Sequence, residues 1–580
     1  MDFGVAKFRR LLLVSCLGLA TTNLVDLTDT MIVGHLLGEK ALAAMNLFWP
    51  CVEFQFFVCM SIASGSAILY SRAAGDFDER RASGVFSNGL VLAALAGLVM
   101  GLGFWLLRGP AAAFYGVTGE TLGYLDSYWR IFALVILLFP VYVYFNTMIA
   151  CDGDLVIGTS AFLTELGVNA VASYFLCRTY GMAGCAMGVV VSTVAGIAVA
   201  SVHFLRKTNS LVFRWHFSVR ESVAAFLADL PEASVSLFTA VVYVVMNKVL
   251  IVEFGENALP VMTAVVATNG FALFLYGVPP AAQPLVGVYW AEGNFGAVRR
   301  VMCAALATSL ILGTLTAAVF ATFPELTVRL IGVETPDVIG QARSAVRIVA
   351  CSYPFLAVTA LFTAYYLYIE RSWLSVSLVA LQGVILPLAF SAVGAFAWKE
   401  NGFWAGYAVA TPLAAFVFFA TMKLLCRDRL EAPPWFLDLT REVYATTWAL
   451  RTEPADICRV AEDVQGKLRK IAAPPKVMAK ASLLVEDMLM EIRRRNGESA
   501  VLAEVLLDVR SDGAVDGQFD ARLILRDDGV IASAKTIASH RNSDECFRGE
   551  VLDRVMKRLA GCRSRVTTGF NRQEFVLSGV

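Results

Sequence analysis

Two aspartates stand three residues apart in an apolar stretch near the start of the chain, Asp26 and Asp29. Residues three apart on a helix share one face, and a charge inside a hydrocarbon environment needs a partner or water. A buried carboxylate in such a place can exchange a proton or bind Na⁺. The pair therefore predicts an ion-coupling site. The alternative is a structural carboxylate that is hydrogen-bonded to a neighbouring threonine hydroxyl.

Three further polar residues stand in apolar stretches and are candidates for the same site. Asn247 and Lys248 occupy the place in the second half of the chain that Asp29 and its neighbour occupy in the first. We expect Lys248 to reach a central cavity and pair with Asp26 or Asp29, unless it extends to the membrane surface instead. Glu165 is expected to line the same cavity.

Three prolines, Pro279, Pro280 and Pro284, fall inside the eighth long apolar stretch. Proline removes a backbone donor and kinks or breaks a helix. A broken helix at membrane depth is typical of transporters that alternate between two open states. The prolines therefore predict a hinge, with a static bend as the alternative.

The composition shows what must position these residues. The chain has 580 residues, of which 57% are hydrophobic and 17% charged, and its mean hydropathy is +0.64. Soluble domains carry about 25% charged residues, so a soluble enzyme or a disordered chain is excluded. The net charge of zero argues against a nucleic-acid partner. Twelve cysteines without a CxxC spacing and only four histidines predict neither a disulfide framework nor a metal site.

The charged residues divide the chain into two parts. Residues 1–430 carry 50 of them, whereas the last 150 residues carry 46. The first part contains twelve stretches long enough to cross a bilayer, which needs about 20 apolar residues. The predicted spans are 8–37, 42–72, 86–108, 125–150, 155–178, 181–205, 222–254, 258–290, 301–324, 343–369, 373–398 and 402–426.

The loops between these spans predict an orientation. With both termini in the cytoplasm, sixteen Lys and Arg residues fall on the inside and six on the outside. Lys7, Arg9 and Arg10 before an apolar run resemble the start of a signal peptide, but the run continues to about Leu37 and more spans follow. We therefore expect an uncleaved first span.

The membrane part repeats itself. Gly38-Glu-Lys-Ala-Leu is echoed by Gly255-Glu-Asn-Ala-Leu, and Gly75-Asp-Phe by Gly293-Asn-Phe, at offsets of 217 and 218 residues. Six spans per repeat place both halves in the membrane in the same direction, related by an axis along the membrane normal. The sequence thus predicts two all-α lobes of six helices, residues 1–215 and 216–430.

The last part of the chain is predicted to be soluble. Residues 431–454 read as a linker. Residues 455–580 read as an α+β domain with helices at 455–470, 476–496 and 551–559, strands at 501–510 and 521–526, and a last strand near Phe575.

Several motifs of the membrane part, taken in register, resemble the multidrug and toxic compound extrusion (MATE) family. They are Asp29-Thr-Met-Ile-Val-Gly34, Gly75-Asp-Phe-Asp-Glu-Arg-Arg81 and Gln283-Pro-Leu-Val-Gly287. The resemblance implies two lobes around a central cavity and export of organic, often cationic compounds in exchange for H⁺ or Na⁺. Asp29 matches the aspartate of the family's first helix.

The tail resembles the histidine-kinase-like ATPase fold of anti-sigma-factor kinases. Asp487 and Glu491 lie where that family has its acidic helix, Asp527 and Gly529 where it holds adenine, and Gly549 before the helix that follows its lid. Glu491 replaces the asparagine that would bind Mg²⁺, and no glycine lies between Gly529 and Gly549, although a phosphate cradle needs close backbone approach. We therefore expect degenerate nucleotide binding or protein contacts rather than ATP hydrolysis.

Together these features predict a secondary antiporter, not an enzyme, in a bacterial-type inner membrane, with a regulatory tail in the cytoplasm. Its expected partners are small organic substrates, the lipid bilayer and a cytoplasmic protein, and no resident cofactor is expected beyond the coupling ion. Two alternatives stay open. One is a flippase for a lipid-linked precursor, which would need a cationic cavity; the other is a membrane sensor that signals through its tail.

Overall fold

A computed structural model describes most of the chain and divides into two compact units, which are described separately. One comprises residues 1–13, 280–305 and 422–580, and the other residues 14–279 and 306–421. The described residues are 2–75, 78–152, 154–206, 209, 211–215, 217–272, 277–292, 294–369, 371–425, 430–431, 436–437, 446–470, 473–509, 520–529, 561–567 and 570–578.

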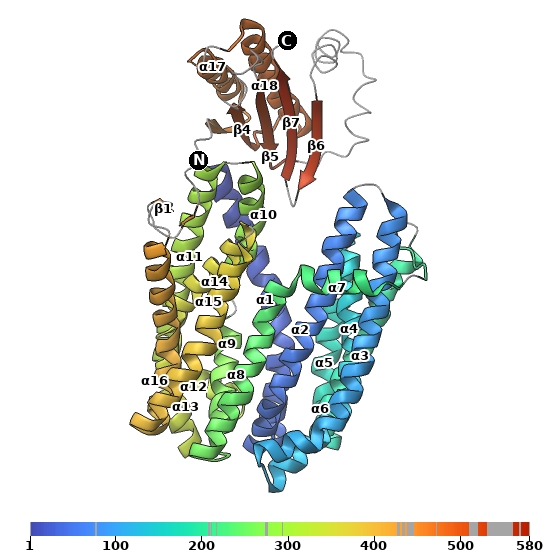
Figure 1. The fold of residues 1–580 in the computed structure, drawn as a ribbon, viewed down its shortest axis with the longest axis vertical. Helices are drawn as coiled ribbons and strands as arrows, with labels where there is room; N and C mark the ends of the chain where they lie inside the picture. Colours follow the sequence, from blue (N-terminus) through green and yellow to red (C-terminus); the bar gives the residue numbers. More distant parts are fainter. Residues whose placement is uncertain are drawn as a thin grey trace. The chain divides into compact units, whose positions relative to one another are not determined.

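Six long helices form the first half of the membrane part (Figure 1). Glycines end two of them: Gly38 and Gly116 have φ of 83° and 74°, a conformation that side chains disfavour. Asp78 begins the third helix by accepting a hydrogen bond from the Arg81 amide at 2.9 Å. The helices are α1 (Phe3–Leu37), α2 (Glu39–Gly75), α3 (Glu79–Tyr115), α4 (Gly119–Cys151), α5 (Leu155–Tyr180) and α6 (Met182–Ser201).

The second half begins after a 3₁₀ turn, η1 (Val202–Leu205), and the short helix α7 (Val219–Ala228), which lies across the long helices rather than alongside them (Figure 1). A π-helical turn, η3 (Leu381–Ile385), precedes the last helix, which is kinked at Trp398 and Lys399. The helices are α8 (Leu230–Phe254), α9 (Ala258–Phe271), α10 (Val278–Ala291), α11 (Phe295–Thr322), α12 (Glu325–Leu330), α13 (Pro336–Ala350), α14 (Tyr353–Tyr368), α15 (Ser372–Ala380) and α16 (Leu386–Leu425).

The prediction of a helical protein with many membrane spans is confirmed. Eight helices of the described part are long and apolar enough to cross a membrane, and a ninth span results if α13 and α14, bent by 51°, count as one. The number of twelve membrane spans stays a prediction. The predicted spans 373–398 and 402–426 meet at Trp398 and Lys399, where the backbone leaves the helical conformation and the chain turns back, so that Gly394 packs closely against Gly402 and Gly406 against Phe390. The count of eight treats this stretch as one span.

The proline-rich predicted span 258–290 is interrupted. It consists of α9 and α10, and Pro279 and Pro280 lie in the first turn of α10, where a missing amide donor costs nothing. Pro284 lies inside α10. Tyr368 donates a hydrogen bond to the Pro279 carbonyl at 3.3 Å. The boundary between the two compact units falls between Pro279 and Pro280, so the predicted break is present, and the hinge function stays a prediction.

The tail contains a five-stranded antiparallel sheet in the order β3-β4-β5-β7-β6. Strand β3 lies in the stretch predicted as linker, so the sheet begins before residue 455. The predicted helix 551–559 and Gly549 lie outside the described residues. The elements are β1 (Leu430–Glu431) and β2 (Phe436–Leu437), which pair with each other, β3 (Thr446–Arg451), α17 (Pro454–Lys470), α18 (Pro475–Arg495), β4 (Leu502–Val509), β5 (Asp520–Asp527), β6 (Gly561–Thr567) and β7 (Phe570–Ser578).

Helices α17 and α18 pack against the tail sheet and form its core (Figure 1). Successive side chains of a strand point to opposite faces. Val505 and Leu507 of β4, with Leu523 and Leu525 of β5, therefore point together toward these helices. The amphipathic pattern that predicted both helices is thus explained by this packing.

Candidate functional site

A cavity of about 470 Å³ lies among helices from both halves of the membrane part. Sites for small organic molecules typically have volumes of 300–1,000 Å³. Its walls come from α1, α2, α8, α9, α14, η3 and α16. The polar and aromatic residues among them include Asp26, Asn46, Trp49, Glu53, Tyr243 and Tyr407.

The charge of this cavity has one sign. Asp26 and Glu53 contribute carboxyl groups, and none of the described residues that line the cavity is Lys, Arg or His. Trp49, Tyr243 and Tyr407 add aromatic surfaces, which attract cations through their negative faces. The cavity can therefore hold a positively charged, partly apolar molecule.

A second carboxyl group in the cavity comes from Glu53 of α2. Asn46, Trp49 and Glu53 follow one another at spacings of three and four residues on α2, and all three line the cavity. Such spacing puts side chains on one helical face. The sequence contains this helical spacing of Asn46, Trp49 and Glu53. The shared face can be recognised only when the three residues are considered together.

Asn247 joins the two halves of the chain beside the cavity. Asn46 donates a hydrogen bond from Nδ2 to Asn247 Oδ1 at 3.0 Å, and Asn247 Nδ2 donates to the Asn46 carbonyl at 3.2 Å. Both side chains are buried, and Asn247 is fully inaccessible. Asn247 was predicted to be a site residue, but its hydrogen-bond partner Asn46 was not identified from the sequence.

Asp29 faces away from the cavity residues and toward α5. Asn169 donates a hydrogen bond from Nδ2 to Asp29 Oδ2 at 3.3 Å and contacts Ser173 Oγ at the same distance. Glu165, one helical turn before Asn169, is buried and is not among the described residues that line the cavity. Asp29 therefore lies in a polar region inside the first half, whereas Asp26 lies in the cavity.

The structure does not bring Lys248 to either aspartate. Its Nζ donates to the carbonyls of Phe114 and Tyr115 at 2.5 and 3.4 Å and lies 5.3 Å from the centre of the Phe114 ring. The last carbonyls of a helix lack intrahelical partners and carry negative partial charge. The long lysine side chain reaches the end of α3 for this reason.

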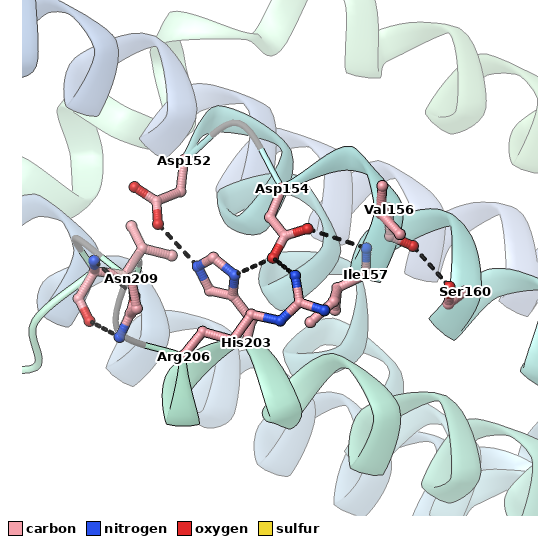
Figure 2. A network of polar contacts seen from close by, with 9 residues as sticks. Asp152, Asp154, Val156, Ile157, Ser160, His203, Arg206 and Asn209 are labelled. Atoms are coloured by element: carbon pink, nitrogen blue, oxygen red, sulfur yellow. Dashed lines mark hydrogen bonds and ion pairs between the residues drawn. The ribbon is translucent and has the colours of Figure 1, made fainter.

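A second polar cluster connects the loop between α4 and α5 to the end of α6. Figure 2 shows His203 between Asp152 and Asp154, at 2.8 and 3.1 Å, with Arg206 3.0 Å from Asp154. Asp154 also begins α5 by accepting from the Ile157 amide. The hydrogen bond from His203, assisted by Arg206, holds the pKa of Asp154 below its usual value. The cluster is a structural junction outside the cavity.

Two of the tail residues that resemble a nucleotide site are engaged by neighbouring arginines. Asp527 is buried and accepts from Arg495 at 3.0 and 2.9 Å and from the Gly529 amide at 3.1 Å. Glu491 pairs with Arg494 at 2.8 Å, and Asp487 lies one turn before it on α18. A side chain at Gly529 would meet Asn496, which fills that space. Asp527 in this arrangement bonds the Arg495 guanidinium with both carboxylate oxygens.

The comparison with protein families is consistent with the repeat and the cavity. The MatE family model matches residues 15–175 and 231–391, which together exceed half of the chain. The probable multidrug resistance protein YoeA of Bacillus subtilis is 26% identical over 195 residues, which cover 32% of this chain and 42% of that protein. The match therefore spans less than half of the relative's length.

Solved structures share the fold. An inward-facing conformation of a multidrug resistance MATE family transporter aligns with a TM-score of 0.64 at 18% identity, covering 72% of this chain and 98% of the other. An outward-facing conformation of a multidrug resistance MATE family transporter aligns with a TM-score of 0.60 at 20% identity, covering 73% and 96%. The matched family model, the internal repeat and this shared fold show that the chain is a multi-pass membrane protein that belongs to the MATE family of secondary transporters.

Proposed function

We propose that this protein exports organic cations from the cytoplasm in exchange for H⁺ or Na⁺ across a bacterial inner membrane. The observation that carries the proposal is the charge of the cavity, which has two carboxyl groups, three aromatic side chains and no basic residue among its described lining. Such a surface attracts a cation with an apolar body.

The two aspartates of α1 have separate roles in this proposal. Asp26 and Glu53 contact the substrate, because they line the cavity. Asp29 binds the coupling ion within the first half, where Asn169 orients it. Since both aspartates lie on one helix, one turn apart, ion binding at Asp29 can change the position of Asp26.

The tail regulates transport through protein contacts in this proposal. Two of its residues that resemble a nucleotide site bond neighbouring arginines, Asp527 with Arg495 and Glu491 with Arg494. This arrangement supports a domain that binds protein surfaces rather than one that hydrolyses ATP.

The flippase alternative receives less support. A lipid-linked pyrophosphate needs basic residues in the cavity, but Lys248 bonds the end of α3. Arg130 lies 2.5 Å from Asp126, and Arg347 donates to the Ala321 carbonyl at 3.2 Å. Lys248, Arg130 and Arg347 are thus engaged away from the described lining of the cavity.

Uptake of a fluorescent organic cation into inverted vesicles tests the proposal. Wild type is compared with Asp29→Asn under an imposed pH gradient and, separately, under a Na⁺ gradient. We expect accumulation under one of the two gradients and its loss in the variant. Accumulation that is unchanged in Asp29→Asn would remove this residue from the coupling site. An absence of accumulation under both gradients would favour the flippase or the sensor.

A further inference from the structure

The second face of the tail sheet is buried although α17 and α18 cover only the first. Glu504 and Leu506 of β4 alternate with the core residues, and Ile524 and Arg526 of β5 are their cross-strand partners. Charged residues in such alternation are typical of a face exposed to water. Here Glu504 is 1% exposed and Arg526 is fully inaccessible. A surface outside the tail therefore covers this face.

That surface is the corner between α10 and α11, within the same compact unit. Arg526 contacts both Glu504 and Glu292, and its guanidinium lies 4.9 Å from the centre of the Tyr289 ring. Tyr289 donates a hydrogen bond to Glu504 at 3.0 Å. Glu292 and Tyr289 are themselves almost inaccessible. Buried charges require such partners, and leaving one of them unpaired is strongly unfavourable.

Further contacts extend this interface to the first residues of the chain. Asn294 donates to Thr447 of β3 at 3.0 Å. Arg10 of α1 forms an ion pair with Asp528, which follows β5, and Arg300 of α11 forms one with Asp2. The tail thus binds α10 through Arg526 and α1 through Asp528, two positions only two residues apart.

The interface is specific to one of the two repeats. Glu292 and Asn294 stand in the second copy of the corner motif, at the places of Ala74 and Asp76 in the first. Tyr289 corresponds to Ser71 in the same register. The first copy therefore lacks both the carboxylate and the aromatic ring that hold Arg526.

We propose that the cytoplasmic partner of the tail is the transporter itself, and that the docked tail is a brake on transport. The inference rests on the proposed export function. Helix α1 continues from the docked residues to Asp29, which bonds Asn169 in the first half, whereas α10 and α11 belong to the second. Alternating access moves the halves against each other. A tail that ties α1 to α10 stabilises one conformation and slows departure from it.

Two substitutions outside the tail, in residues of the membrane part that contact it, test this proposal in the full chain. They are Arg10→Met and Glu292→Gln. The matched control is Arg9→Met, because Arg9 is exposed and forms no ion pair within the described part of the chain. Two quantities are measured in vesicles or nanodiscs: hydrogen exchange of residues 502–509 and 522–527, and gradient-driven uptake of the fluorescent cation.

We expect faster exchange of both strands and uptake raised by roughly two- to fivefold in Arg10→Met, with a larger increase in Glu292→Gln and none in Arg9→Met. Unchanged exchange in both variants would refute the docked interface. Faster exchange with unchanged or slower uptake would refute the brake. If wild type and all variants lack uptake under both gradients, the export function fails, while the exchange measurement still decides whether the tail docks.

Discussion

Asn169 donates a hydrogen bond to Asp29 across 3.3 Å and so joins α5 to α1 inside the first half of the transporter. One turn earlier on α1, Asp26 lines the central cavity. Two carboxylates that share a helix therefore have different surroundings. In the proposed mechanism this separation lets an ion and a substrate occupy adjacent sites, with α1 as the element that connects them.

The amide of Asn169 should matter for coupling and not for substrate binding. In Asn169→Ala, Asp29 loses the hydrogen bond from this amide, and we expect gradient-driven uptake to fall about tenfold, since a hydrogen bond to a charged group contributes about 1.5–3 kcal/mol. Binding of the fluorescent cation to detergent-solubilised protein should stay within twofold of wild type. An equal loss of binding and uptake would contradict the separation of the two sites.

Glu53 should determine affinity for charged substrates. In Glu53→Gln the cavity keeps its shape but loses one carboxylate, and we expect the Kd of an organic cation to rise about tenfold, which corresponds to about 1.4 kcal/mol. Glu53→Asp, which retains the charge, should recover most of the affinity. Fluorescence titration with a cationic dye and an uncharged analogue checks the result, and equal weakening for both dyes would show that charge is not the cause.

The Asn46–Asn247 pair should behave as one unit. Replacing either residue with alanine leaves the other buried without its partner, which costs about 1–3 kcal/mol. We expect the double variant Asn46→Ala/Asn247→Ala to lose clearly less stability than the sum of the single variants. Thermal unfolding of the purified protein measures all three, and additive losses would show that the two amides do not depend on each other.

The close approach at Gly34 should not tolerate a side chain. A Cβ at Gly34 would overlap the Ile331 carbonyl oxygen, so Gly34→Ala must move α1 away from the segment after α12. We expect a lower melting temperature and slower uptake, with a stability loss of about 1–3 kcal/mol. The control is Gly103→Ala, a helix position with open space around it, where alanine should be neutral or stabilise the helix. Equal effects of both substitutions would contradict this packing argument.

The Asp154 carboxylate should stabilise the folded protein at neutral pH and lose this effect only at acidic pH. His203 lowers the pKa of the folded-state carboxyl below the ordinary value of 3.8, so the folded protein binds fewer protons than the unfolded chain there. This contribution to stability is complete above about pH 4 and disappears as the pH falls through the lowered pKa. The melting temperature of Asp154→Asn should therefore lie below that of wild type at pH 7 and at pH 5, and approach it near pH 3. A difference that is the same at pH 3 and pH 7 would assign the effect to the helix cap alone.

Much of the architecture could be predicted because it depends on local patterns. Apolar runs of membrane length predicted the helices, and the 217-residue offset between Gly38 and Gly255 predicted the repeat. Prolines 279 and 280 predicted the interruption between α9 and α10. In the tail, amphipathic spacing predicted α17 and α18, whereas β3 was missed because its pairing with β4 is not a local property.

Only part of the candidate site could be predicted from the amino-acid sequence, and the remaining part depends on how the helices pack. Residue types and helical spacing were sufficient to identify Asp26 and Asp29 as candidate site carboxylates, because a charge in an apolar segment carries an energetic penalty and needs a partner or water. Residue types and spacing could not tell that Asp29 is buried against Asn169 whereas Asp26 is only partly buried and lines a cavity, that Lys248 bonds the end of α3, or that Glu292 meets Arg526 more than two hundred residues away. Each of these outcomes depends on which helix packs beside which, and that choice is made by contacts between residues distant in the chain.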